Sequence, residues 1–339
     1  MGILVFHSRI TAIGTYVPQR KLTNDDLEKM VDTSHEWIVQ RTGIHERRIA
    51  ERDEFTSDLC ISAVRNLVSR YNKTIEDVDF IIVCTTTPDF PFPTVSCLIE
   101  AHFQIQNAGA IDISAACAGF TYGLIMAHGL IASGLHRKVL VIAGETLSKI
   151  TDYSDRTTCV LFGDAAGAVL VERDDQFEGF VSHHVGSDGT GGVHIYRTGL
   201  ANRLGEQKLC DNNCIVQNGR EVFRWVMRTI PNSIHQLMNK SSQTINDVDW
   251  FIPHSANLRL IEPLCEKLEF PIESTLHSLT HFGNTSSSTI PLSLDLGIRS
   301  GKIRAGDKAL LYGFGAGLVH AGVLVRLQLD PVVNEPLPL

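Results

Sequence analysis

The chain has 339 residues, of which 43% are hydrophobic and 20% are charged, and its formal net charge is −8. This composition is typical of a globular protein, and the length fits two domain-sized units with a large core. The acidic balance argues against general nucleic-acid binding, because no basic stripe offsets it.

Neither export nor membrane insertion is predicted. Residues 1–6 lack the basic segment of a secretory signal. The apolar, uncharged run 309–325 contains four glycines and is predicted to form two buried strands joined by a turn. The eight cysteines are scattered, so we expect reduced thiols in a cytoplasmic protein. Cys210 and Cys214 form a lone pair, which is too few ligands for a zinc site.

Patterns typical of strands and helices alternate in the first half. Thr23 and Asp26 have the spacing of an N-cap and the third residue of a helix. The apolar run 78–84 is typical of a central parallel strand. The other predicted elements are a strand over 3–14, helices over 56–71 and 98–103, a proline-rich loop over 88–93, and strands over 139–143 and 168–171.

The segment 35–48 is the most basic part of this half, with Trp37, Arg41, Arg47 and Arg48. It has two interpretations. It could be a solvated helix end, or it could bind phosphates, with the indole available for stacking.

Cys117 lies between a short apolar strand and a predicted helix. The segment 109–120 begins as the strand and ends in very small residues, and a 3.6-residue apolar period starts at Ala118. Unpaired N–H groups and the helix dipole favour an anion there, so we expect a thiol with a lowered pKa that acts as a nucleophile. The alternative is a buried cysteine that acts as a small hydrophobic residue.

The second half opens with a long polar stretch, 183–219, which is predicted to run over the surface. Within it, the adjacent His183 and His184 are interpreted as polar loop residues. A helix is predicted over 222–230. The charged segment 172–178 is taken as the boundary between an N-terminal half, 1–175, and a C-terminal half, 176–339.

The two halves repeat each other. Residues 74–81 return as 244–251, a shift of 170 (244 − 74), and 139–144 is answered by 310–315, a shift of 171 (310 − 139). Such matched spacing predicts a duplicated α/β fold in which corresponding turns meet in the middle.

This duplication would bring Cys117, His254 and Asn284 together. His254 follows a predicted strand, and Asn284 lies in a turn at 283–288 that corresponds to the Cys117 turn. Cysteine, histidine and asparagine suit thioester chemistry, because the thiolate attacks a carbonyl while N–H groups of the imidazole and the amide stabilise an enolate. Taken singly, His254 could be a core histidine and Asn284 a helix cap.

Several long motifs in this order resemble the beta-ketoacyl-acyl-carrier-protein synthase III family, the initiating condensing enzymes of bacterial type II fatty acid synthesis within the thiolase superfamily. The resemblance covers nearly the whole chain. It implies a thiolase-like αβαβα five-layer fold made of two duplicated halves, and a homodimer. The motifs that carry it are 35–44, 115–120, 155–158, 162–168, 254–257 and 283–286.

The resemblance also implies a reaction. Cys117 would be acylated by an acyl-CoA primer, and His254 and Asn284 would assist decarboxylation of malonyl-acyl-carrier protein and its condensation with the acyl group. Backbone N–H groups of Cys117 and Ala316 would form the oxyanion hole. Neither a metal nor another cofactor is implied, since the coenzyme A thioester is a substrate.

Binding residues follow from the same motifs. Coenzyme A and its pantetheine arm would contact Thr33, Trp37, Arg41, Arg156, Gly219, Phe223 and Asn257. The carrier protein would contact Ser255, Ala256, Asn257, Leu258, Arg259, Arg224 and Lys267. Phe92 would reach the acyl pocket of the partner subunit.

Two positions depart from the family pattern. Ala316 replaces the middle glycine of a triple-glycine loop, where it keeps the N–H but would be strained by a positive φ. Glu266 replaces a usual lysine of the carrier-protein patch. The primer stays open, as do two rival functions: a related acyltransferase or thioesterase-like enzyme that never condenses, and a non-catalytic dimer partner.

Overall fold

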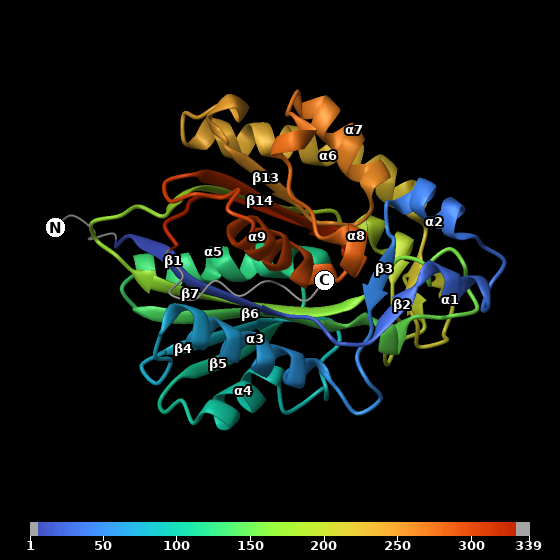
Figure 1. The fold of residues 1–339 in the computed structure, drawn as a ribbon, viewed down its shortest axis with the longest axis horizontal. Coiled ribbons are helices and arrows are strands. Elements are labelled where there is room, and N and C mark those ends of the chain that lie inside the picture. The colour runs from blue at the N-terminus through green and yellow to red at the C-terminus, as the bar shows by residue number, and fades with distance from the viewer. Residues whose placement is uncertain (1–5, 330–339) are drawn as a thin grey trace.

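Five layers of secondary structure are stacked in the computed structural model, which describes residues 6–329 (Figure 1). The layers are helix, sheet, helix, sheet and helix, and they confirm the predicted fold class. The helices are α6 (Gly219–Lys240) and α7 (Leu258–Leu268) outside one sheet, α3 (Thr56–Tyr71) and α4 (Val95–Phe103) outside the other, and α5 (Gly119–Ala132) and α9 (Thr289–Arg299) between the sheets.

Four strands of the first sheet have the same topology as the second sheet, and β5 (Gly109–Ile113) is an additional edge strand. The first sheet has the order β1 (Ser8–Tyr16), β7 (Asp164–Arg173), β6 (Lys138–Thr146), β4 (Phe80–Cys84) and β5. The second has the order β13 (Trp250–Pro253), β14 (Lys308–Gly315), β15 (Val319–Arg326) and β8 (Phe180–Ser187). The pairs β4–β6 and β13–β14 are parallel. The pairs β6–β7 and β7–β1 in the first sheet, and β14–β15 and β15–β8 in the second, are antiparallel. The chain is therefore duplicated, as the repeats predicted.

The strand register makes this correspondence residue by residue. Phe80 of β4 pairs with Val139 of β6, and Trp250 of β13 pairs with Ala309 of β14. Each residue of the second pair thus lies 170 positions after its counterpart in the first pair (250 − 80 and 309 − 139). The boundary between residues 175 and 176 falls in the connection from β7 to β8 and stays a prediction.

Each inner helix follows a short 3-10 turn. The turn η1 (Ala116–Ala118) leads into α5, and η6 (Ser286–Ser288) leads into α9. Both helices are apolar on several sides, as sandwiching between two sheets requires, and the two turns contact each other. The duplication thereby brings the Cys117 turn to the Asn284 turn at the centre of the molecule.

Several smaller elements match the sequence. Thr23 and Asp26 form the predicted capping box of the first helix. The run 309–325 contains all of β14 except Lys308 and all of β15 except Arg326. The predicted strand over 3–14 is found as β1, while residues 3–5, like most of the segment inspected for a signal, lie outside the described residues. The remaining elements are α1 (Asn24–Glu28), α2 (His35–Thr42), α8 (Leu279–Phe282), β2 (Lys21–Thr23), β3 (Glu46–Arg48), β9 (Ile195–Tyr196), β10 (Arg203–Leu204), β11 (Gln207–Lys208) and β12 (Val216–Gln217).

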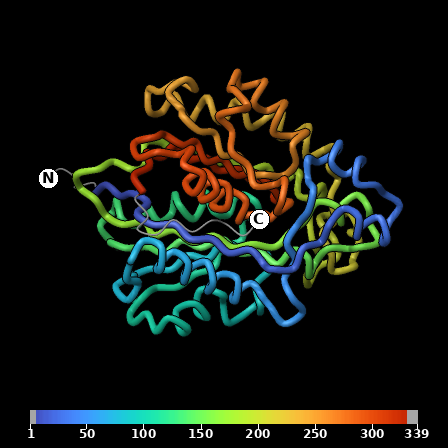
Figure 2. Tube along the Cα trace, viewed as in Figure 1, coloured from blue at the N-terminus to red at the C-terminus, as the bar shows by residue number. Residues whose placement is uncertain are grey.

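The predicted surface excursion over 183–219 is wrong at its start. His183 and His184 lie in β8, which pairs with β15, so they are strand residues rather than loop residues. The part from 188 to 217 forms loops, a 3-10 turn and short strands, at the end of the molecule that also carries α1 and α2 (Figure 2).

Both interpretations of the basic segment fail for two of its arginines. Arg47 is 0% and Arg48 2% exposed, so neither is solvated and neither can meet a phosphate at the surface. In the part of the chain that the structure describes, no helix combines the length and the apolar character needed to cross a membrane.

Candidate active site

Cys117 lies in η1 at the start of α5, as predicted. Ala116 before it has a φ of 44°, which turns the chain sharply from strand to helix. Strand β14 runs directly against this turn: a Cβ on Gly313 would lie 2.7 Å from the Ala118 Cα, and a Cβ on Gly315 would lie 2.9 Å from the Cys117 Cβ. The two glycines therefore allow the close approach.

The expected lowering of the Cys117 pKa is wrong. Burial raises the pKa of this thiol to about 12, although a hydrogen bond with Ser286 acts in the opposite direction, and the charge of the buried Glu145 raises it further. Loss of solvation disfavours the thiolate, and it outweighs the benefit of the helix N-terminus. Cys117 is therefore a neutral thiol in the free chain.

His254 follows β13 and is 2% exposed. Its backbone N–H donates to the Tyr312 carbonyl (2.8 Å), and its Nδ1 lies 2.8 Å from the Thr289 hydroxyl. The edge of the ring meets Phe314, with 5.4 Å between ring centroids. Burial lowers the pKa of His254 to about 3, so the imidazole is neutral at physiological pH, and its Nδ1 contact leaves Nε2 as the nitrogen available to a substrate.

The backbone of Asn284 is held by the segment 161–163. Its N–H donates to the Leu161 carbonyl (2.8 Å), and its carbonyl accepts from the Gly163 N–H (3.0 Å). The side-chain Oδ1 accepts from the Ser286 N–H (2.9 Å). The oxygen thus acts like a cap at the start of η6, and the Nδ2 donors remain for a ligand.

Two cavities meet at Cys117. The first, of about 380 Å³, is lined by Cys117, His254 and Asn284 together and extends to Trp37 and Arg259. The second, of about 300 Å³, has a largely apolar wall and also includes Ala316 and Cys117. The three predicted catalytic side chains thus open onto one cavity, and the sulfur faces a second one. The apolar wall is made by Leu147, Ile150, Phe162, Ile195 and Ile215.

Several residues predicted to bind coenzyme A line the first cavity. Arg41, Gly219, Phe223 and Asn257 are among them. The Asn257 Oδ1 is buried and has no hydrogen-bond partner within the described residues, which suits an acceptor for an amide N–H of a ligand. Thr33 lies outside this lining.

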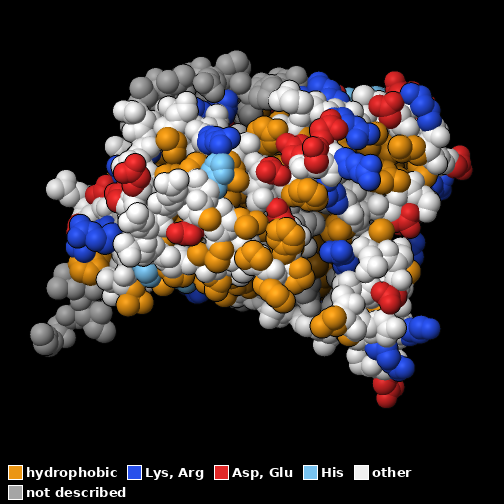
Figure 3. All heavy atoms as spheres, turned by 90° about the horizontal axis from the view of Figure 1, so that it is seen from below, with side chains coloured by type: hydrophobic (Ala, Val, Ile, Leu, Met, Phe, Trp, Pro, Cys, Tyr) orange, Lys and Arg blue, Asp and Glu red, His pale blue; other side chains and the backbone are white. Residues whose placement is uncertain are grey.

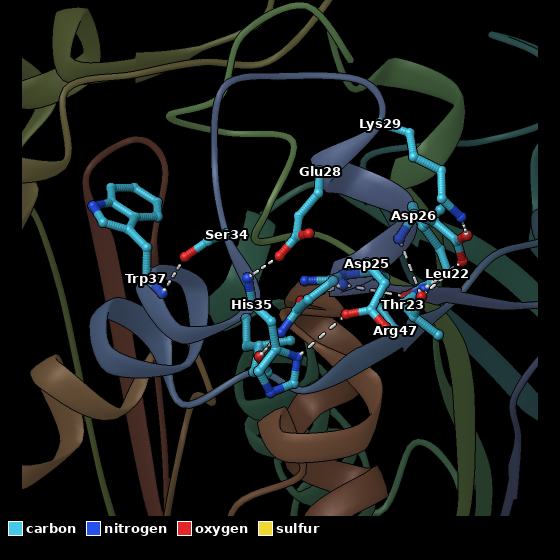
Figure 4. A network of polar contacts seen from close by, with 12 residues as sticks. Leu22, Thr23, Asp25, Asp26, Glu28, Lys29, Ser34, His35, Trp37 and Arg47 are labelled. Atoms are coloured by element: carbon cyan, nitrogen blue, oxygen red, sulfur yellow. Dashed lines mark hydrogen bonds and ion pairs between the residues drawn. The ribbon is translucent and has the colours of Figure 1, made fainter.

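Trp37 carries two arginines over its ring. The guanidinium carbon of Arg156 lies 5.5 Å and that of Arg41 5.8 Å from the ring centroid. The Ser34 hydroxyl caps α2 by accepting from the Trp37 N–H at 3.1 Å, which anchors the indole at the start of the helix (Figure 4). An aromatic ring flanked by guanidinium groups suits a flat aromatic ligand such as adenine.

The residues predicted to contact a carrier protein are divided by burial. Ser255 is 0% exposed, and its hydroxyl accepts from the Ser278 N–H, so the expectation that its side chain docks a protein is wrong. Ala256, Asn257 and Leu258 are half-buried, whereas Arg259, Arg224, Lys267 and also Glu266 are exposed.

Strain at Ala316 is not found. Positive φ angles are confined to other residues of the described chain, and the neighbouring Gly317 takes a φ of 144°. Ala316 therefore has an ordinary backbone, and it lines the second cavity together with Cys117. Phe92 is 84% exposed and lines neither cavity.

Three polar residues of the site were missed by sequence reasoning: Glu145, Ser286 and Thr289. Ser286 and Thr289 belong to the serine and threonine run after Asn284, which could have indicated a cluster of hydroxyl groups next to the site. Glu145 sits in an apolar strand and gives no such signal. No set of three or more histidine, cysteine or acidic side chains between residues 6 and 329 is arranged to hold a metal ion.

Comparison with known families gives two matches. Residues 111–189 match the model of 3-oxoacyl-[acyl-carrier-protein (ACP)] synthase III, and residues 238–327 match the model of its C-terminal part. The first match contains Cys117, and the second contains His254 and Asn284.

Individual proteins match over nearly the whole chain. A beta-ketoacyl-[acyl-carrier-protein] synthase III 2 of Halalkalibacterium halodurans is 59% identical over 95% of this chain and 97% of its own. One of Bacillus subtilis, with the same name, is 58% identical over 94% and 98%. A crystal structure of the Thermus thermophilus synthase III is 43% identical, superposes with a TM-score of 0.91, and covers 94% of this chain and 99% of its own.

Proposed function

The chain belongs to the beta-ketoacyl-acyl-carrier-protein synthase III family, and on this basis we propose that it initiates fatty acid synthesis. It transfers the acyl group of an acyl-CoA primer to a malonyl-acyl-carrier protein, with loss of carbon dioxide, and gives a beta-ketoacyl-acyl-carrier protein. The observation that carries this proposal is the place of Cys117, where an apolar cavity meets a cavity lined by His254 and Asn284.

In the first step Cys117 takes the acyl group. The thiol loses its proton and attacks the thioester carbonyl, and the coenzyme A sulfur leaves and is protonated to the free thiol. The N–H groups of Cys117 and Ala316 stabilise the oxyanion, and the acyl chain occupies the apolar cavity. The burial of the thiol makes its deprotonation the demanding part of this step.

In the second step the malonyl thioester enters the cavity beside His254 and Asn284. Its carboxylate leaves as carbon dioxide, and the resulting enolate oxygen is stabilised by the Asn284 amide and the imidazole Nε2. The enolate carbon attacks the acyl-cysteine carbonyl, and the tetrahedral intermediate collapses to release the thiolate of Cys117. No proton has to be held by Asn284, which does not titrate.

The entrance residues hold the carrier of each thioester. Trp37 and Arg156 sandwich the adenine of coenzyme A, while Arg41, Gly219, Phe223 and Asn257 line the pantetheine path. The part proposed for Thr33 at the entrance rests on the family resemblance alone. Arg224, Arg259 and Lys267 attract an acidic carrier protein. Glu266 opposes that attraction locally.

We further propose a homodimer in the cytoplasm. Phe90 and Phe92 are 52% and 84% exposed, and Ile111 of the edge strand β5 is 39% exposed. Hydrophobic side chains also gather on the face seen in Figure 3. An apolar surface of this kind supports covering by a second copy, with Phe92 reaching the partner's acyl cavity.

The test is a pair of half-reactions. Incubation with an acyl-CoA should add the acyl mass to Cys117, and malonyl-acyl-carrier protein should then release carbon dioxide and form the beta-ketoacyl product. Cys117→Ala should abolish acyl transfer, while His254→Ala should retain much of the acylation and lose condensation. Turnover retained in Cys117→Ala would refute the proposal.

The same assay separates the rival functions. A non-condensing acyltransferase would acylate Cys117 but release no carbon dioxide from the malonyl carrier. A non-catalytic dimer partner would not be acylated. A panel of acetyl, straight-chain and branched primers would identify the natural acyl group.

A further inference from the structure

Arg47 is a fully buried guanidinium with only neutral hydrogen-bond partners. It lies in β3 and is 0% exposed. One terminal nitrogen donates to the Asn24 Oδ1 (2.9 Å) and the Leu22 carbonyl (3.2 Å), and the other donates to the Val160 carbonyl (2.8 Å) (Figure 4). Its Nε has no hydrogen-bond partner, and no ion pair joins it to an acidic residue within the described chain.

The stem of this side chain is enclosed by two glycines of the candidate site. A Cβ on Gly163 would lie 3.0 Å from the Arg47 Cβ, and a Cβ on Gly283 would lie 3.2 Å from it. Gly163 ends the segment that holds the Asn284 backbone, and Gly283 directly precedes Asn284. Arg47 thus packs against both segments, at Gly163 and at Gly283, next to Asn284.

The guanidinium fixes the beginning of the same segment. Val160, which accepts from Arg47, precedes Leu161, and the carbonyl of Leu161 accepts from the Asn284 N–H at 2.8 Å. Hydrogen bonds of Val160 with Arg47, and of Leu161 and Gly163 with Asn284, thus connect the guanidinium to the Asn284 backbone through the segment 160–163. A lysine could not reproduce this forked donation.

We infer that Arg47 is a positioning residue for Asn284, and that it serves the decarboxylation and condensation step rather than the acylation of Cys117. The inference rests on the proposed function. Arg47 itself lines neither cavity and has no contact with Cys117 among its hydrogen bonds, and it reaches the first cavity only through its acceptor Val160, which is part of the lining.

Fold stability alone does not account for a charge at this place. Burial lowers the pKa of Arg47 to about 10, so the group is still charged at neutral pH. A buried charge without an acidic partner is costly, and a hydrophobic side chain of similar size is often tolerated better. What Arg47 adds is a rigid set of donors that ties Val160 to Asn24.

The test compares Arg47→Lys and Arg47→Met with the wild type in the two half-reactions. Acylation of Cys117 by acyl-CoA should stay within about 3-fold, while carbon dioxide release by the acylated enzyme should fall on the order of 10- to 100-fold, the size of effect expected when a catalytic group is displaced by about 1 Å. Arg48→Met is the matched control, because Arg48 is equally buried but donates to Pro18 and Gln19. Its two rates should change together or not at all.

A double variant isolates Asn284. In an Asn284→Ala background, Arg47→Lys should cause no further loss of carbon dioxide release, because the group that Arg47 positions is gone. An equal fall of both half-reactions in both Arg47 variants, or an undiminished effect of Arg47→Lys in the Asn284→Ala background, would overturn the inference. A wild type that is acylated but releases no carbon dioxide would instead refute the proposed function.

Discussion

Gly315 lies so close to Cys117 that a Cβ on this glycine would be 3.1 Å from the sulfur and 2.9 Å from the cysteine Cβ. The close contact brings the end of β14 from the C-terminal half against the nucleophile of the N-terminal half. The next residue, Ala316, lines the second cavity together with Cys117. The proposed oxyanion site would thus lie where the two copies meet.

Gly315→Ala should therefore impair acylation strongly. The added methyl group must push the Cys117 turn or β14 aside, and a displacement of about 1 Å at a reacting group can reduce the rate on the order of 100-fold. The rate of Cys117 acylation by acyl-CoA, followed by mass spectrometry, measures this effect. The control is Gly129→Ala in α5, where a Cβ would meet no atom within 4 Å, and where alanine favours the helix. Normal acylation in Gly315→Ala would contradict the assigned geometry.

The reactivity of Cys117 should depend steeply on pH. Burial raises the pKa of its thiol to about 12, and only the thiolate reacts with iodoacetamide. The thiolate fraction, and with it the alkylation rate of Cys117 in the free enzyme, should rise about 10-fold per pH unit between pH 7 and 10 without a plateau. Peptide mass spectrometry separates Cys117 from the exposed cysteines.

A plateau of the alkylation rate near neutral pH would be the opposite result. It would mean that the helix N-terminus lowers the thiol pKa more than burial raises it, as the sequence pattern alone indicated. Cys117→Ser provides the control that assigns the modified peptide.

The sequence allowed the fold and the clustering of Cys117, His254 and Asn284 to be predicted, because both leave local signals. The repeat of 74–81 at 244–251 indicated the duplication, and the small residues before α5 indicated the turn that carries Cys117. Because the Asn284 turn corresponds to the Cys117 turn in the other half, and corresponding turns of a duplicated fold meet in the middle, Asn284 was predicted to lie near Cys117.

What was missed depends on contacts between distant parts of the chain. Arg47 looked like a surface cation, but its acceptor Val160 lies 113 positions away. The Cys117 pKa follows from burial, which no local pattern reveals. β8 was taken for a loop because its inward positions carry Ser182, His184 and Gly186 instead of large apolar residues.

The Thr289 hydroxyl should determine which nitrogen of His254 carries the proton. It lies 2.8 Å from Nδ1 and 2.9 Å from the Ser286 carbonyl, and its single proton can be directed fully to only one of them. The proposed enolate stabilisation needs a proton on Nε2, so Thr289 should donate to Nδ1. Nitrogen-15 NMR of histidine-labelled enzyme should show the Nε2–H tautomer.

Thr289→Val should then shift His254 toward the Nδ1–H tautomer and reduce carbon dioxide release more than acylation. Finding Nδ1–H in the wild type would exclude the imidazole as a donor to the enolate and would leave Asn284 as the side-chain donor. Because the pKa of His254 is lowered to about 3, the spectrum should not change between pH 5 and 8.

The two halves should also depend for stability on one buried carboxylate, that of Asp295. Arg70 of α3 donates to Asp295 of α9 at 2.5 Å, and both side chains are 0% exposed. The second carboxylate oxygen accepts from Thr15 at 2.6 Å and from Arg299 of α9 at 2.8 Å. Asp295→Asn removes the negative charge and leaves the buried guanidinium groups of Arg70 and Arg299 without this counterion, which should lower the free energy of unfolding by roughly 3–5 kcal/mol. Urea denaturation measures this loss. The matched change Asp175→Asn, at an exposed pair with Arg173, should leave the midpoint unchanged, because solvent screens such pairs. An equally small effect of both variants would show that the halves are held together by apolar packing alone.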